Sequence, residues 1–284
     1  MNHKIHIWLT TILLLSANNI ISATINENTV PEPFSVQTID KTDLAKYAVT
    51  TKATTSSSAT GLFANGYPTT IEEGTDSKNI KVTTTYNGKE VTYELPGSST
   101  VVFGGKYNDD CDATNITLKS GTVYSIVGGG YGTSSENSAD VTTSTINLNG
   151  GTVNNWVVGG GAYYSKTTTA NINAKGEAAP TVNGWMIGCI ESGSITTGTA
   201  YPEFDNTPCK LETMNLDIQK GTYWLIALAG GNGTRSFTKT GNATIKGTSD
   251  APVSINGGLF GCGSNGRGES ATGSIEYCTL SANE

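Results

Sequence analysis

Short alternations of apolar and polar residues, separated by clusters of glycine, dominate the chain from about residue 98 onward. One phrase recurs about every 30 residues. Its clearest copies are SGTVYSIVGGGYG at 120–132 and GGTVNNWVVGGGAYY at 150–164, and weaker copies stand at 180–189, 221–231 and 252–262. A repeat of this size indicates stacked units, each too small to bury its own apolar face.

Each unit contains two apolar alternations of strand length. The first includes pairs such as Ile146 and Leu148, and the second includes pairs such as Val153 and Val157. No helical periodicity separates them, so a βαβ sheet is excluded. A propeller needs about four strands in a blade of 40 or more residues, and these units are too short for that. The pattern predicts an all-β, right-handed parallel β-helix of about six turns.

Four segments follow from this pattern. A short positive start, an apolar run and the small residues Ile21-Ser22-Ala23 identify 1–23 as a cleaved signal peptide. Residues 24–60 are expected to be a flexible, Thr/Ser-rich leader. Residues 61–97 hold two β-prone arms around Asn87-Gly88, which predicts an N-terminal β-hairpin cap. The β-helix repeats are expected to fill 98–284.

Net charge and composition limit the classes of function that the chain can have. The net charge is −7, and both histidines, His3 and His6, lie within the signal segment. An acidic chain does not suit nucleic-acid binding, which needs a basic face. No second apolar stretch approaches the length of a membrane span, so no transmembrane segment is expected after signal cleavage. These features predict an exported, glycine-rich protein.

The five cysteines leave two interpretations open. Cys189 and Cys262 each follow the last glycine of a repeat, and each has a later cysteine within one turn. This suggests the disulfides Cys189–Cys209 and Cys262–Cys278, with Cys111 left over. Five free buried thiols are the alternative.

The consensus GGTVxxxVxGGG, with polar TxIxL strands between the copies, resembles the repeats of bacterial adhesin-like and autotransporter-like surface proteins. The match is closest across 115–164 and weakens after Cys189, where the triple glycine is lost. The resemblance implies a Gly-rich parallel β-helix at the cell surface and a role in adhesion.

Aromatic side chains are the first candidate binding residues. Tyr107, Tyr131 and Tyr163 follow the glycines at similar positions, with Tyr164 beside them, and would stack as a ladder. The ladder could contact a glycan or serve only to hold neighbouring turns together. Trp156 and Trp185 would stack in the same way, either as an exposed platform or as a secondary core.

Acidic residues give weaker candidates. Asp109, Asp110 and Asp112 suggest either a weak Ca²⁺ site or a solvated loop. Catalysis by histidine-dependent triads is unavailable once the signal is removed. A pair of carboxylates could still serve a carbohydrate-active enzyme, and the residues around the long fourth loop are the acidic candidates: Glu191, Glu203, Asp205 and Glu212.

The favoured function is therefore a secreted or cell-surface, non-enzymatic, adhesin-like module that binds a surface glycan or a protein ligand. Two alternatives stay open. One is a polysaccharide lyase or glycoside hydrolase built on a β-helix. The other is an ice-binding protein, suggested by threonine runs such as 142–145, although a regular T-x-T array at every turn is not evident.

Overall fold

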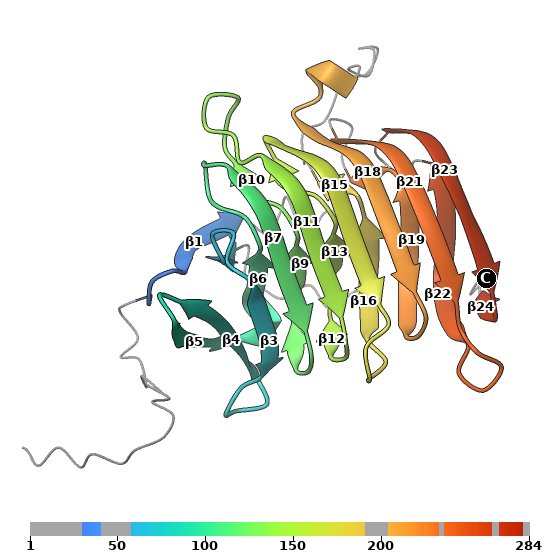
Figure 1. The fold of residues 1–284 in the computed structure, drawn as a ribbon, viewed down its shortest axis with the longest axis horizontal. Coiled ribbons are helices and arrows are strands. Elements are labelled where there is room, and N and C mark those ends of the chain that lie inside the picture. Colours follow the sequence, from blue (N-terminus) through green and yellow to red (C-terminus); the bar gives the residue numbers. More distant parts are fainter. Residues whose placement is uncertain (1–29, 41–57, 191–203, 233–235, 263–266, 281–284) are drawn as a thin grey trace, which may run out of the picture.

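The described residues form three sheets: sheet A of eleven strands, sheet B of nine and sheet C of four. The computed structural model describes residues 30–40, 58–190, 204–232, 236–262 and 267–280. Apart from two short 3₁₀ helices, η1 (Gly97–Ser99) and η2 (Phe204–Asn206), the regular elements of this part of the chain are all strands. The chain is therefore all-β, as the alternating pattern predicts (Figure 1).

Four consecutive segments repeat the same path through the three sheets, and two further segments continue two of them. The first gives β7 (Cys111–Leu118) to sheet B, β8 (Thr122–Val123) and β9 (Ser125–Val127) to sheet A, and β10 (Tyr131–Gly132) to sheet C. The next three follow the same order. The second consists of β11 (Val141–Leu148), β12 (Thr152–Val153), β13 (Trp156–Val158) and β14 (Ala162–Tyr163). The third consists of β15 (Ser165–Ala174), β16 (Thr181–Ile187) and β17 (Cys189–Ile190), and the fourth of β18 (Cys209–Ile218), β19 (Thr222–Ala229) and β20 (Gly231–Asn232).

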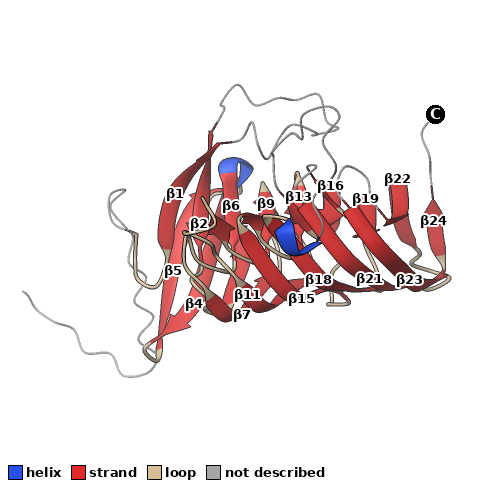
Figure 2. Ribbon diagram, turned by 90° about the horizontal axis from the view of Figure 1, so that it is seen from above, coloured by secondary structure: helices blue, strands red, loops and turns tan. Residues whose placement is uncertain are grey.

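The last two segments contribute to sheets B and A. They are β21 (Ser236–Lys246) with β22 (Val253–Cys262), and β23 (Arg267–Glu276) with β24 (Cys278–Leu280). Equivalent strands of successive segments are parallel, and those of sheet B are in register. In sheet A, the register shifts by a bulge within the β16–β19 and β19–β22 pairs. Figure 2 shows the strands of sheets A and B as two layers on opposite sides of the molecule.

The main core lies between sheets A and B. Apolar positions of sheet B stack from segment to segment, for example Ile116, Ile146 and Ile172. Leu62, Val102 and Ile126 line the facing side of sheet A. Because the residues between them in sheet B are polar, only one face of that sheet joins the core.

Glycines allow the segments to approach closely where sheet A ends. A side chain on Gly128 would collide with the carbonyl oxygen of Gly159 in the next segment. The Ser144 hydroxyl donates a hydrogen bond to the same Gly159 oxygen, and Thr114 donates to the Gly128 oxygen at 2.6 Å. The glycine cluster is thus a corner whose carbonyls are satisfied from sheet B.

The predicted hairpin is present. Strands β4 (Asn79–Tyr86) and β5 (Lys89–Pro96) pair antiparallel, and Asn87 and Gly88 both have positive φ, as a type I′ turn requires. The hairpin precedes the first of the six segments in the chain. It is inserted between β3 (Thr69–Glu73), which pairs with β7, and β6 (Thr100–Phe103), which pairs with β9.

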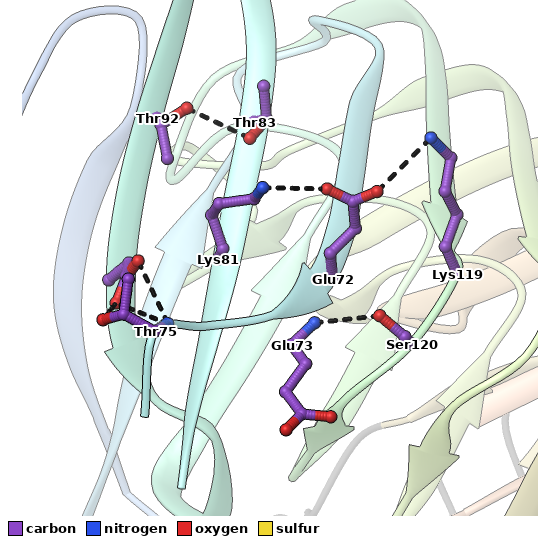
Figure 3. Close-up of polar contacts among 9 residues, drawn as sticks. Glu72, Glu73, Thr75, Lys81, Thr83, Thr92, Lys119 and Ser120 are labelled. Carbon is purple, nitrogen blue, oxygen red and sulfur yellow. Dashed lines mark hydrogen bonds and ion pairs between the residues drawn. The ribbon is translucent and has the colours of Figure 1, made fainter. Parts of the chain in front are cut away.

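Polar contacts fasten the hairpin to the first segment (Figure 3). The Glu72 carboxylate lies 3.1 Å from Lys81 Nζ and 3.5 Å from Lys119 Nζ, and the hydrogen bond from Lys81 lowers the pKa of Glu72. The Glu73 backbone N–H donates to Ser120 Oγ at 3.0 Å. These contacts tie β3 to β4 on one side and to the end of β7 on the other.

The expected flexible leader is contradicted at 35–40, where the chain forms a strand. Residues 1–29 and 41–57, including the proposed signal peptide, lie outside the described residues. Within the leader, β1 (Ser35–Asp40) forms a strand that pairs antiparallel with β2 (Ser58–Phe63). Phe34 and Ile39 are buried, so this part of the segment has apolar surface to contribute, and the flexible-leader interpretation does not apply to it.

Candidate functional site

The predicted tyrosine ladder forms at the edge where sheet C begins. Tyr107 and Tyr131 are joined by a parallel bridge, and their rings are stacked with centroids 5.7 Å apart and planes 13° apart. The Tyr131 and Tyr163 rings are 4.7 Å apart at a 40° tilt. The rings therefore cover one another along the stack.

The same tyrosines pack on a second apolar cluster, on the face of sheet A that points away from the main core. Tyr107 meets Phe63 edge-on at 5.5 Å, and Tyr131 meets Phe103 edge-on at 5.9 Å. All three tyrosines of the ladder are half-buried. Tyr164 is half-buried as well, and its carbonyl accepts a hydrogen bond from the Ala139 N–H at 3.1 Å. This packing gives the ladder a structural role whatever else it does.

The tryptophan pair lies in the same cluster. Trp156 and Trp185 are register partners in β13 and β16, with ring centroids 5.6 Å apart. Trp156 is only 1% exposed, whereas Trp185 and Trp224 are half-buried. The buried indole N–H groups of Trp156 and Trp185 have no hydrogen-bond partner within the described structure. Burial of Trp156 favours a secondary core over an exposed platform.

The acidic loop does not form the suggested Ca²⁺ site. The Asp109 carboxylate pairs with Lys106 Nζ at 2.6 Å, and this hydrogen bond lowers the pKa of Asp109. Asp110 Oδ1 instead accepts the backbone N–H of Asp140 at 2.7 Å. In the described ranges, no three His, Cys, Asp or Glu side chains converge as a metal site requires. Asp109 and Asp110 thus have separate partners, and the carboxylates of the loop do not converge on one point.

A polar cleft opens beside this loop. Its volume is about 600 Å³, and its lining comes from the loop and from the first residues of β7, β11 and β15: Lys106, Asp110, Cys111, Asp112, Asp140, Val141, Thr142, Lys166 and Thr168. The strand register makes Asp112, Thr142 and Thr168 equivalent positions of three successive segments. Consecutive segments therefore each add one polar side chain to the same wall.

Backbone contacts fix the inner part of this wall. Asp110 Oδ1 accepts from the Asp140 N–H, and Asp140 Oδ1 accepts from the Lys166 N–H at 2.9 Å. Lys166 Nζ lies 3.5 Å from Glu212 of the fourth segment. Asp112, Thr142 and Thr168 make no side-chain hydrogen bond with the described residues, so their polar atoms can bind a ligand.

Cys111 contributes a thiol to the cleft. Burial raises the pKa of its thiol, with a smaller opposing effect from Lys106. A thiol with a raised pKa stays protonated at neutral pH, and only the thiolate is a good nucleophile. The cleft therefore offers carboxylates, ammonium groups, hydroxyls and a neutral thiol, a set suited to hydrogen bonding with a polar ligand.

Sequence reasoning had singled out part of this site. The structure brings the tyrosine ladder and the Asp109–Asp112 loop to one edge of the molecule, where Tyr107 directly follows Lys106. Asp140, Lys166 and Thr168 were missed as cleft residues, and Thr142 was named only as part of the 142–145 threonine run. The detectable signal was that they occupy equivalent places just before and after the start of the sheet B strands.

The predicted disulfides are wrong. None of the five cysteines, all of which are described, forms a disulfide. The buried Cys189 thiol points at the carbonyl oxygens of Cys209 and Phe237, at 3.5 and 3.4 Å. Cys262 pairs with Ala229 at the end of β22, whereas Cys278 pairs with Val253 at its start. The ten-residue strand separates these two by about 30 Å, far beyond disulfide reach.

The acidic candidates near the fourth loop do not gather. Glu191 and Glu203 lie outside the described residues. Asp205 is exposed in η2, and its backbone oxygen accepts from Lys210 Nζ at 2.8 Å. Glu212 belongs to the ion pair with Lys166.

Comparison of the chain with family models, with curated proteins and with solved structures gives no match. The described part of the chain contains no helix of the length and apolarity that crossing a membrane would need.

Proposed function

We propose that the chain is a right-handed parallel β-helix acting as an exported, non-enzymatic, adhesin-like module that binds glycans in the polar cleft. The β-helix is supported by four segments that pass through the same three sheets in the same order and by two more that continue sheets B and A, with parallel pairing that is in register in sheet B. Right-handedness is the rule for crossovers between parallel strands of one sheet. Export rests on the signal-like segment at 1–23.

The observation that carries the binding proposal is the lining of the cleft. Asp112, Thr142 and Thr168 present a carboxylate and two hydroxyls in a row, and Lys106 and Lys166 add ammonium donors. Carboxylates accept, ammonium groups donate and hydroxyls do both, which complements the many hydroxyls of a sugar. A rigid wall built from three strands also lowers the cost of ordering the binding groups.

A binding role suits the cleft better than a catalytic one. General acid–base or nucleophilic catalysis needs a group that can change its protonation or attack during turnover. Asp110 and Asp140 are held as acceptors for the backbone N–H groups of the next segment, and the Cys111 thiol is kept protonated by burial. These groups therefore suit a structural role better than a catalytic one.

A glycan array tests the proposal. The wild-type chain is expected to bind at least one class of glycan. The triple variant Asp112→Ala/Thr142→Ala/Thr168→Ala should bind that class at least tenfold more weakly, because losing even two hydrogen bonds of about 1 kcal/mol each exceeds a factor of ten. These three side chains have no partner in the described structure, so the variant should fold.

A matched control is available on another sheet. Thr152 and Thr181 are register partners at the start of the sheet A strands, away from the cleft lining. The control Thr152→Ala/Thr181→Ala should bind as wild type does. Absence of any glycan binding by the wild type, or equal binding by the triple variant, would overturn the proposal.

A further inference from the structure

The outer face of sheet B carries a second polar feature, independent of the cleft. Two neighbouring columns run across its strands, which lie side by side as one broad face (Figure 1). The threonine column consists of Thr143, Thr169, Thr213, Thr240 and Ser270. The asparagine column consists of Thr145, Asn171, Asn215, Asn242 and Thr272.

Register makes these columns a regular lattice. Members of one column come from adjacent parallel strands, about 4.8 Å apart, and the two columns are two residues apart along each strand, about 6.6 Å. Because every pair is in register over β11, β15, β18, β21 and β23, the spacing repeats without a break. The face therefore presents polar groups at two fixed spacings, one across the strands and one along them.

Hydrogen bonds hold the asparagine column in place. Asn215 Nδ2 donates to Asn171 Oδ1 at 3.0 Å, Asn242 Nδ2 donates to Asn215 Oδ1 at 3.0 Å, and Thr272 Oγ1 donates to Asn242 Oδ1 at 2.9 Å. Asn215 and Asn242 each use one of their two N–H groups in this way, and Asn171 accepts through its oxygen. The remaining N–H and oxygen lone pairs are left in a fixed orientation.

The threonine column has its hydroxyls available. Thr143, Thr169, Thr213 and Thr240 are half-exposed, and their hydroxyls make no hydrogen bond with the described residues. A hydroxyl can both donate and accept, as a water molecule does. The column is thus a row of preplaced water-like groups beside a row of fixed amides.

The chemistry of the lattice selects its ligand. Neither column contains a charged side chain, which disfavours minerals, nucleic acids and charged polymers. Neither column lines the cleft, so the columns lack the concave surroundings in which a single sugar would be enclosed. The matching partner is an uncharged solid with hydroxyl groups at a short regular repeat. We propose that the outer face of sheet B binds the surface of ice, with the two columns replacing ordered water molecules.

The proposal that the cleft binds glycans and the proposal that the outer face of sheet B binds ice can fail separately. Many weak contacts at fixed spacing act together, so disturbing the lattice at two points should abolish binding. Assays of thermal hysteresis and of ice recrystallisation with the purified chain measure binding to ice. The wild type should separate the melting and freezing points, and Thr169→Lys/Thr213→Lys should lose most of that hysteresis.

A matched column on sheet A provides the control. Thr122, Thr152, Thr181 and Thr222 are also in register and half-exposed. Beside them, the asparagines are limited to one pair, Asn154 and Asn183, joined by a single bond of 3.4 Å, and Tyr124 and Trp224 occupy the other two positions. Thr152→Lys/Thr181→Lys should keep the wild-type hysteresis, and circular dichroism should show both variants folded. Wild-type hysteresis no greater than that of serum albumin, or equal loss in both variants, would overturn the proposal. Retention on crystalline cellulose or chitin without hysteresis would overturn it too.

Discussion

The outer faces of sheets A and B are built from the same segments but differ in polarity and in exposure to solvent. On sheet A, the face away from the main core is apolar and closed, with Phe103, Val127 and Trp156 in one cluster. On sheet B, the corresponding face is polar and open, with the threonine and asparagine columns. Because the segments stack, the residue type at one position of the repeat recurs along a whole column. The residue types at a few repeat positions therefore determine whether an entire face of the sheet is apolar or polar.

The local sequences show how the difference arises. Strands of sheet A read as continuous apolar runs such as Trp156–Val158, which bury side chains on both faces. Strands of sheet B alternate, as in Met214–Ile218, and bury only one. We infer that stability is concentrated on sheet A and binding on the sheet B side, where both the cleft and the lattice lie.

The largest expected effect is on the sheet A side. Trp156 is 1% exposed and stacks on Trp185, so Trp156→Ala leaves a cavity in the second cluster. Urea denaturation should show a loss of about 3–5 kcal/mol in the free energy of unfolding. Tyr277→Ala, at a side chain 58% exposed, is the control and should change little. A loss below about 1 kcal/mol for Trp156→Ala would show that the cluster does not act as a core.

A smaller effect is expected in the asparagine column. Asn215 donates to Asn171 and accepts from Asn242, so Asn215→Ala removes two hydrogen bonds from a half-exposed ladder. The free energy of unfolding should fall by about 1 kcal/mol, because water replaces part of what is lost. Asn183→Ala, with one longer bond of 3.4 Å to Asn154 on sheet A, should cost less. An equal or larger loss for Asn183→Ala would contradict the ladder's role.

The smallest effect concerns pH. Lys175 Nζ lies 2.6 Å from the Asp217 carboxylate, and this hydrogen bond is the main reason that the pKa of Asp217 is lowered. A lowered pKa in the folded state means that the carboxylate stabilises the fold above its ordinary pKa of about 3.9, and that this contribution is lost as the pH falls through the lowered value.

Asp217→Asn should therefore reduce the difference in unfolding free energy between pH 6 and pH 2. The side chains of the pair are 50% and 31% exposed, so the change should stay below about 1 kcal/mol. A pH dependence that is unchanged in the variant would show that the pair contributes nothing.

Much of the arrangement is predictable from short-range pattern. Ile146 and Leu148 alternate as a strand of one-sided burial should, Asn87-Gly88 makes its hairpin turn, and the spacing of Tyr107, Tyr131 and Tyr163 anticipates their stack. Each of these features depends on residues close in sequence or on simple repetition.

What depends on register across long separations is harder to predict. β10, β14 and β17 have two residues each, too few for a visible alternation, so sheet C was missed. The pairing of β1 with β2 spans an intervening segment that carries no signal. Cys262 and Cys278 are close in sequence but belong to opposite ends of one strand pair, which only the register reveals.

The most direct test of the division between the two sides is a calorimetric titration with the glycan that binds best. The account predicts that Asp112→Ala/Thr142→Ala/Thr168→Ala raises the dissociation constant at least tenfold while its urea midpoint stays at the wild-type value. Thr152→Ala/Thr181→Ala should leave the dissociation constant unchanged. Equal affinity of the cleft variant and the wild type, or a loss of affinity confined to the sheet A variant, would contradict the account.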